Sequence, residues 1–358
     1  MGLIRFVARR ILFSVLIIVA EIIFIFLLTS FASSDPALIW AGPDSTAQQV
    51  AIIAARYHLD APLYIQLYYY LVNFFSGNWG VSPTYEQPVI SLIETYFPVT
   101  FELAVLAFVV KVLLEVSLGI VSAMRPNGLV DNTIKVFYTT VRSAPPFLIA
   151  IGLLLVFSYW PKFNFGITIF PSSNSINPLL NVPQFMLYNP LTGKSSPVWL
   201  LDNMPILNAL LVGDWPAFAS AVQHAILPIV ALVLFGFGAL VRVVKVSMLE
   251  VLDQDYIRTA RSKGLKERGV ILVHALRNSL LPAFTVMGLT FAGLATGSLV
   301  AEYIFGYYGL GYYIGQSLFT FDTPSLIAAT VLVTIIIVVA NLITDVSYGF
   351  LDPRTAQG

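Results

Sequence analysis

The chain of 358 residues has no cysteine and few charged side chains. The lack of cysteine excludes disulfide bonds, thiolate metal sites and thiol nucleophiles, and it leaves the redox compartment undetermined. Charged residues make up 11% of the sequence and hydrophobic residues 58%, against roughly 25% and 45–50% in an average soluble domain. This composition argues strongly against a soluble globular protein.

The sequence also lacks net charge and the common motifs of cofactor binding. Nineteen basic and 19 acidic side chains cancel, so no overall field attracts nucleic acid, and we predict no nucleic-acid partner. His58, His224 and His274 are the only histidines, and they lie far apart in the sequence. Gly193-Lys194-Ser195 lacks the earlier glycine that a phosphate-binding loop requires. We therefore expect no metal, no cofactor and no catalytic residue in this chain.

Apolar residues are present instead, in six long runs. A bilayer core about 30 Å thick needs about 20 apolar residues as a helix, because unpaired backbone groups cannot remain in hydrocarbon. The sequence predicts an all-α integral membrane protein with six transmembrane helices. The expected spans are residues 11–31, 98–124, 133–160, 222–241, 279–300 and 324–348.

The first run has two interpretations, because Arg5, Arg9 and Arg10 precede it as they would in a signal peptide. Its apolar stretch exceeds the roughly 7–15 residues of a signal core, and no clean cleavage site follows. We interpret it as an uncleaved span.

The distribution of basic residues predicts the orientation of the spans. If the chain starts inside, 14 of the 19 lysines and arginines fall in inner segments and three in outer loops. Short loops rich in lysine and arginine remain in the cytoplasm. We predict a multi-pass protein of the cell (plasma or inner) membrane with both termini cytoplasmic.

Two outer loops are long. In the first, helices are expected after Ser45 and from Leu63 to Phe75, and the second of these carries aromatic residues that suit either the membrane interface or a small folded cap. The second loop holds 8 of the 21 prolines, which argues for extended or irregular chain. The predicted segments are 1–31 with the first span, the loop 32–97, spans two and three in 98–160, the loop 161–220, spans four to six in 221–350, and a cytoplasmic tail 351–358.

Six charged residues lie within the first three apolar runs: Glu21, Glu102, Lys111, Glu115, Lys135 and Arg142. Lys111 and Glu115 are four residues apart on one helix and can pair with each other. Glu115 and Arg142 each lie nine residues from the inner end of a span, about 13 Å along the helix axis. We hypothesise that Glu115 and Arg142 face each other across an antiparallel helix pair. So few intramembrane charges do not make a convincing proton relay.

The longest cytoplasmic segment, residues 242–278, contains eight basic residues. Apolar side chains recur in it at helical spacing, Gly264 is placed to end that helix, and a second helix is expected over 266–277 before a span begins at Leu281-Pro282. The apolar positions of the first helix are Leu249, Leu252, Tyr256 and Ala260. Such a helix can lie on anionic lipid or dock a cytoplasmic partner.

This segment resembles the signature loop of the permease subunits of binding-protein-dependent ABC importers. The resemblance rests on residues 250–265, on His274 to Asn278 and on Leu281-Pro282. More narrowly, the chain resembles the B-type subunit of the dipeptide/oligopeptide group. It covers nearly all of the chain outside 161–220. Further matching segments are Asp35-Pro36, Leu59 to Pro62, Gln87 to Ile90, Gly309-Leu310-Gly311 and Leu351 to Arg354.

The resemblance implies an ABC importer permease fold in which this loop forms a coupling helix that docks on an ATPase. Arg258-Thr259-Ala260 stand at the Glu-Ala-Ala position of the family motif, with Gly264 as its glycine, so that Arg258 replaces the glutamate. Leu281-Pro282 also comes later than in the general motif. The implied docking residues are Asp255, Tyr256, Arg258, Thr259, Ala260, Arg261, Lys263, Gly264 and Leu265, with His274, Arg277, Asn278 and Pro282 in a second part of the loop.

The resemblance further implies a subunit that is not itself an enzyme and that translocates di- or oligopeptides delivered by an extracellular binding protein. Its partners would be a homologous second permease, two ATPases that bind ATP and Mg, the binding protein and membrane lipid. Glu302, Gly309 and Gly311 are candidate contacts for the binding protein.

Other functions remain open. The same machinery can carry oligosaccharides. An ion-coupled secondary transporter would show broken helices and a midplane carboxylate within an inverted repeat. An intramembrane enzyme would need a convergent nucleophile, metal or acid pair, and a membrane scaffold is a further alternative.

Overall fold

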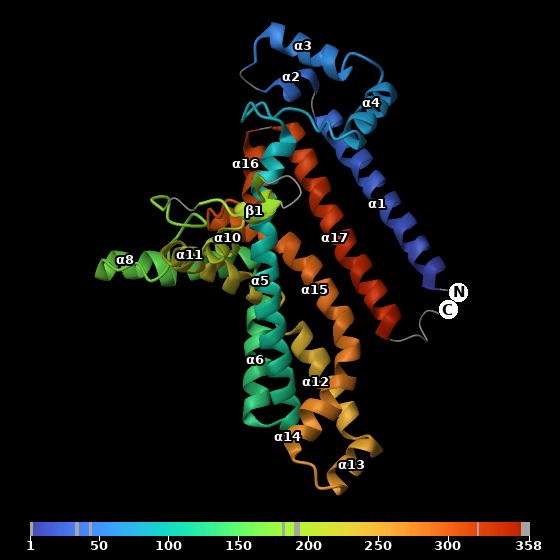
Figure 1. The fold of residues 1–358 in the computed structure, drawn as a ribbon, viewed down its shortest axis with the longest axis vertical. Coiled ribbons are helices and arrows are strands. Elements are labelled where there is room, and N and C mark those ends of the chain that lie inside the picture. Colours follow the sequence, from blue (N-terminus) through green and yellow to red (C-terminus); the bar gives the residue numbers. More distant parts are fainter. Residues whose placement is uncertain are drawn as a thin grey trace.

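The computed structural model describes residues 3–32, 36–42, 45–180, 183–189, 194–320 and 322–351. Helices form most of these residues (Figure 1). Within them, six helical segments are long and apolar enough to cross a membrane, which confirms the all-α class and the expected number of spans. The six segments are Ala8–Leu28, Val89–Met124, Pro146–Phe165, Trp215–Leu234, Glu267–Ile304 and Thr323–Thr344.

Helix α5 (Val89–Met124) is the centre of the fold. It contacts α12 (Ala239–Leu252), α15 (Leu276–Ile304) and α11 (Trp215–Leu234), and α15 packs in turn against α17 (Thr323–Leu351). The buried side chains at these contacts are mainly small or aliphatic, such as Ala107 and Leu232, which lets the helices approach closely.

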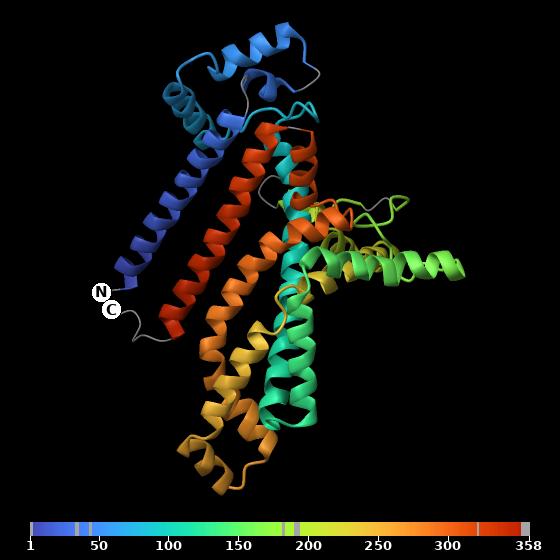
Figure 2. The ribbon, with the colours of Figure 1, turned by 180° about the vertical axis from the view of Figure 1, so that it is seen from behind.

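Helix α1 (Leu3–Ala32) packs along α17 at one edge of the molecule. Figures 1 and 2 show that α1 starts, and α17 ends, toward the end of the molecule that carries α13 (Asp255–Ser262). An even number of crossings produces this arrangement. Three short helices lie at the opposite end of the molecule: α2 (Pro36–Ala41), α3 (Ala47–Tyr57) and α4 (Leu63–Phe75).

The expected third span, 133–160, is wrong as a continuous helix. Helix α6 (Leu129–Ser143) ends before Ala144, whose backbone is extended at φ −84° and ψ 135°. Ala144 precedes Pro145, and the proline ring disfavours helical geometry in the residue before it. The chain then turns away from α5 through α7 (Pro146–Leu154), a π-helical turn at Leu155–Tyr159 and α8 (Trp160–Phe165), which point sideways in both views (Figures 1 and 2).

The expected fourth span, 222–241, is also interrupted. Helix α11 ends at Leu234, and α12 starts at Ala239 in a different direction. Gly236 and Gly238 have φ angles of +63° and +93°, which glycine adopts readily, so the chain can turn sharply between the two helices.

Two prolines that were expected to mark helix starts lie inside helices. Helix α5 begins at Val89 and contains Pro98. A π-helical turn at Val270–Ala275 leads without interruption into α15, which contains Pro282. A proline removes one backbone hydrogen bond, and long helices packed on both sides tolerate that loss.

The second outer loop, expected to be extended or irregular, contains regular structure. Strands β1 (Met186–Asn189) and β2 (Lys194–Pro197) pair antiparallel. The helices α9 (Trp199–Asp202) and α10 (Pro205–Val212) follow. Pro205 occupies the first turn of α10, where its missing N–H is not needed, so a high proline content did not prevent a helix here.

The helices expected in the first outer loop agree closely with the structure. Helix α3 carries a capping box between Thr46 and Gln49, and α4 covers Leu63–Phe75, as expected. Asp35, Arg354 and the tail from position 352 onward lie outside the described residues.

Candidate functional site

Helix α13 (Asp255–Ser262) projects at one end of the molecule, beyond the ends of α5 and α12 (Figure 2). The chain breaks after α12 at Asp253-Gln254, so the single amphipathic helix expected from Leu249 to Ala260 is wrong. Two side chains of α13, Ile257 and Ala260, are buried. Tyr256, expected on the buried stripe, is 42% exposed.

The buried side of α13 packs on a small apolar cluster. Ile257 and Ala260 share this cluster with Met248 of α12 and with Val270 and Ala275 of the π-helical turn. Fully burying one aliphatic side chain stabilises a fold by about 1.5–3 kcal/mol. Ile257 therefore fixes α13 to the transmembrane body while its other faces stay exposed.

Polar contacts also tie α13 to the segment that follows it. The Asn278 side-chain amide donates to the Tyr256 hydroxyl at 2.8 Å. Arg261 pairs with Glu267, at the start of the short helix α14 (Glu267–Gly269), at 2.8 Å. The pair formed by Arg258 and Asp255 at 3.3 Å is exposed and contributes little stability.

Gly264 ends the helical segment in left-handed geometry, with φ at +77°. An added side chain there would meet no atom within 4 Å, so the backbone angle rather than crowding favours glycine. The predicted helix end at Gly264 is therefore confirmed.

The residues predicted for docking divide into an exposed and a buried group. Ala260 is buried, and Arg277, Asn278 and Pro282 lie inside α15 rather than in the loop. The exposed predicted residues are Asp255, Tyr256, Arg258, Thr259, Arg261, Lys263, Gly264, Leu265, His274, Arg277, Asn278 and Pro282. Together they form a surface rich in basic groups around α13.

A second constellation lies at the break between α11 and α12. The Lys111 ammonium donates to the carbonyl oxygens of Val233 at 2.6 Å and Phe235 at 2.9 Å, and it lies 2.8 Å from the Glu115 carboxylate. That carboxylate accepts from the backbone N–H of Leu240 at 3.0 Å and of Val241 at 3.4 Å.

This pair satisfies both helix ends at the break. The last carbonyls of α11 and the first N–H groups of α12 have no partners within their own helices. Lys111 binds the former and Glu115 the latter, and each charge opposes the partial charge of the helix end that it contacts. Sequence spacing predicted that these two residues pair, and the structure confirms it.

The hypothesis that Glu115 faces Arg142 is wrong. Helix α6 does run beside α5, but the Arg142 side chain is exposed, and in the described part of the chain no ion pair joins it to Glu115. The Glu115 carboxylate instead points toward the start of α12, where it accepts hydrogen bonds from backbone N–H groups.

Asp131 forms a third polar cluster, which the sequence interpretation missed. Its fully buried carboxylate lies 2.6 Å from Lys245 of α12 and 2.9 Å from Lys135 of α6. It also accepts from the Ser122 hydroxyl and the Asn127 N–H. The spacing of Asp131 and Lys135 was a signal for half of this cluster, but nothing local indicated Lys245.

The environment of Asp131 lowers the pKa of its carboxyl below the usual range. Burial by itself raises this pKa, but donation from Lys245, Ser122, Lys135 and the Asn127 N–H favours the ionised form more strongly. Asp131 therefore remains charged and joins the α5–α6 turn to α12.

Glu302, Gly309 and Gly311 are buried, so the prediction that they contact an external protein is wrong for this structure. The Glu302 carboxylate accepts from the Thr100 hydroxyl at 3.0 Å and the Gly311 N–H at 2.6 Å. A side chain at Gly309 would lie 2.5 Å from that carboxylate. The three residues fix the turn between α15 and α16 (Leu310–Phe319).

Comparison with known proteins identifies similar sequences along nearly the whole chain. The family described as binding-protein-dependent transport system inner membrane component matches residues 115–357. The family described as the N-terminal part of such membrane components matches residues 3–104. The match over 115–357 includes α13 and begins at Glu115. Lys111 lies between the two matched ranges.

Curated relatives are similar over comparable lengths. The probable D,D-dipeptide transport system permease protein DdpB of Escherichia coli (strain K12) is 32% identical over 345 residues, which cover 96% of this chain and 95% of the relative. The dipeptide transport system permease protein DppB of the same strain is 30% identical, with 98% of each chain covered. DppB of Bacillus subtilis (strain 168) is 32% identical, with 84% and 82% covered.

Proposed function

Because the chain belongs to the family of inner membrane components of binding-protein-dependent transport systems, we propose that it is the translocating permease subunit of an ABC importer for di- and oligopeptides. The chain is accordingly a multi-pass membrane protein and a transport subunit rather than an enzyme. Relatives named for dipeptide or peptide transport favour peptides over oligosaccharides as the substrate.

The observation that carries the proposal is helix α13. A short helix that exposes Arg258 and Arg261, while Ile257 anchors it to the transmembrane helices, can transmit a displacement from a cytoplasmic partner to those helices. We propose that one of two partner ATPases binds here and that these ATPases bind ATP and Mg, so that this chain needs no cofactor of its own. Both termini would then lie on the cytoplasmic side with α13.

The remaining partners are a homologous second permease, an extracellular peptide-binding protein and lipid. The sideways segment of α7, α8 and α11 supports the second permease, because apolar side chains such as Leu148, Leu155 and Phe163 are exposed on it. Lipid covers the other apolar faces of the spans.

An ion-coupled transporter has one feature in its favour, the broken fourth span beside the Glu115 carboxylate. Lys111 neutralises that carboxylate and backbone N–H groups occupy it. The family assignment and the exposed α13 therefore favour the ATP-driven importer.

Substitution of Gly264 tests the docking role of α13. Gly264→Asp adds a charge beside α13 at a left-handed backbone position. We expect loss of ATP-dependent uptake of a radiolabelled alanine dipeptide in proteoliposomes that contain the complete importer, with normal membrane insertion.

Gly77→Asp is the matched control, because Gly77 is also exposed and left-handed, at φ +83°, but lies next to α4 at the other end of the molecule. It should retain uptake. Normal uptake by the Gly264→Asp importer would overturn the docking role, and uptake of oligosaccharides but not dipeptides would overturn the substrate class.

A further inference from the structure

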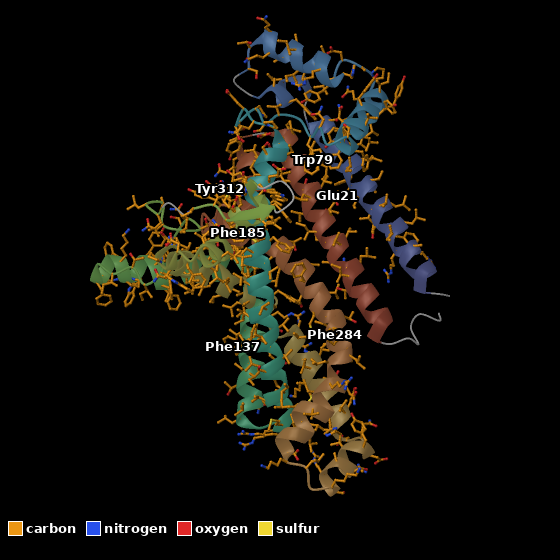
Figure 3. The ribbon with its side chains drawn as sticks, in the orientation of Figure 1. Glu21, Trp79, Phe137, Phe185, Phe284 and Tyr312 are labelled. Carbon is orange, nitrogen blue, oxygen red and sulfur yellow. The ribbon has the colours of Figure 1, made fainter. Side chains whose placement is uncertain are left out.

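A cavity of about 570 Å³ lies in the half of the molecule away from α13. Its walls come from the first turns of α5, from α9 and α10, and from the beginning of α16 with the turn that precedes it. Figure 3 shows Tyr312 of α16 on the flank of α5 where Phe185 and the β1 strand also lie. The volume falls within the usual range of small-ligand sites, about 300–1,000 Å³.

Tyrosine rings that contact one another form much of the wall. Tyr96 stacks on Tyr313 with ring centroids 4.9 Å apart, and Tyr308 meets Tyr312 edge to face at the same separation. On the other side, the Glu102 carboxylate accepts from the Leu207 N–H at 2.6 Å and holds the first turn of α10. The cavity is therefore built from fixed elements.

The polar groups in the wall are one carboxylate, two side-chain amides, and the hydroxyls of the tyrosines, Thr95 and Ser175. Asn208 is 5% exposed, and its amide N–H₂ donates to the Pro183 carbonyl at 3.3 Å. Its Oδ1 is buried without a hydrogen-bond partner in the described part of the chain. The half-buried Asp202 carboxylate accepts from the Phe185 N–H at 2.8 Å.

No lysine, arginine or histidine stands among the described residues that line this cavity. A carboxylate and an unpartnered amide oxygen favour a cation with N–H donors, and aromatic rings such as the four tyrosines of the wall attract cations as well. An anion or an uncharged sugar would supply no positive charge to the Asp202 carboxylate, whose neighbour among the described residues is the uncharged Phe185 N–H.

We propose that this cavity is a subsite for the α-ammonium group of a short peptide. The inference rests on the proposed function and extends it, because it names the end of the substrate that this chain recognises. Asn208 Oδ1 and Asp202 accept hydrogen bonds from the ammonium group, and tyrosine rings cover its remaining face.

The absence of cysteine permits a direct test, since a single introduced thiol is the only one in the chain. Thr95 is exposed and lines the cavity, so Thr95→Cys in the full-length chain in nanodiscs reports on its occupancy. Trialanine at twice its dissociation constant or above should slow the reaction of this thiol with a maleimide by about threefold or more, because only the unoccupied fraction, 1/(1 + c/Kd) at peptide concentration c, reacts. N-acetyl-trialanine should not slow it.

Ser76→Cys, exposed at the end of α4, is the control thiol and should react equally fast with either peptide. In the Thr95→Cys background, Asp202→Asn should remove the protection by trialanine while keeping an acceptor for the Phe185 N–H. Asn208→Leu should also remove the protection by trialanine. Asp60→Asn, which changes an exposed carboxylate elsewhere, should leave the protection unchanged. Thermal unfolding of each variant establishes that it is folded.

Equal protection by the two peptides, or protection by neither, would overturn the subsite. If the thiol of Thr95→Cys is protected by added binding protein but by neither peptide, a protein side chain rather than a peptide occupies the cavity, and the peptide subsite is overturned. Dipeptide uptake is measured separately, so uptake without protection refutes the subsite alone, and protection without uptake refutes the proposed transport function alone.

Discussion

Asp131 has no exposed surface and lies within 3 Å of two ammonium groups, those of Lys245 and Lys135. A buried acceptor of this kind stabilises the fold only while its partners remain in place. The same holds at Glu302, whose carboxylate accepts from Thr100 and Gly311. At the scale of single residues, buried carboxylates hold chain segments that are distant in sequence.

Substitution of Asp131 should destabilise the protein. Asp131→Asn keeps the shape but removes the charge that Lys245 and Lys135 require, so the free energy of unfolding should fall by about 1–3 kcal/mol. Thermal unfolding in detergent measures the difference. Asp255→Asn, which breaks an exposed pair, should leave the unfolding temperature unchanged. Equal effects of the two variants would contradict the importance of burial.

The pH dependence of stability follows from the lowered pKa of Asp131. A carboxyl whose pKa is lower in the folded than in the unfolded state stabilises the fold above its unfolded pKa of about 3.9. That stabilisation is lost as the pH falls through the lower folded pKa. The unfolding temperatures of the native chain and Asp131→Asn should therefore differ at neutral pH and converge in acid, and a constant difference would refute this assignment.

At the scale of elements, the break between α11 and α12 depends on two side chains of a third helix. Lys111 of α5 donates to the last carbonyls of α11, and Glu115 of α5 accepts from the first N–H groups of α12. The two side chains also pair with each other. A broken helix inside a membrane is tolerated where neighbouring groups satisfy the freed backbone atoms. The two residues should therefore act as a unit.

A double-mutant cycle tests this coupling. Lys111→Met or Glu115→Leu alone leaves one buried charge unpaired, whereas the double variant leaves none. The double variant should be more stable than the sum of the single effects indicates, by about 0.5–3 kcal/mol, in thermal or denaturant unfolding. Arg142→Met combined with Glu115→Leu is the control pair and should be additive, because Arg142 is exposed. Additive effects for Lys111 and Glu115 would show that they act independently.

At the scale of the whole molecule, the described start of α1 and end of α17 lie toward the α13 end, while α3 and α4 form the opposite end. This agrees with the excess of basic residues in the segments predicted to be cytoplasmic. The proposed orientation places α13 inside the cell and the peptide subsite toward the outside.

Single thiols can establish this orientation, because the chain contributes no background cysteine. In intact cells, a membrane-impermeant maleimide should label Ser76→Cys and should fail to label Lys266→Cys until the cells are opened. Both residues are exposed, so a difference in labelling reports the side of the membrane. The reverse pattern would invert the proposed topology.

The sequence by itself determined the membrane class, the number of spans, the helix α4 and the turn at Gly264, because these depend on composition, periodicity and local backbone preference. The pairing of Lys111 with Glu115 also follows from helical spacing alone. The family resemblance, too, could be seen in the residues around Gly264.

Only the tertiary structure decided where the spans break, what Glu115 contacts and which residues meet in the cavity. Pro98 and Pro282 lie inside helices although prolines usually mark helix starts, whereas Ala144 and Gly238 lie at real breaks. Glu115 turned to α12 rather than to Arg142, because unpaired N–H groups at a helix start attract a carboxylate and are invisible in a linear sequence. Likewise, Asp202 and Tyr308 line one cavity only because α9, α10 and α16 pack around the same turns of α5. Such meetings depend on long-range packing, which local residue preferences do not encode.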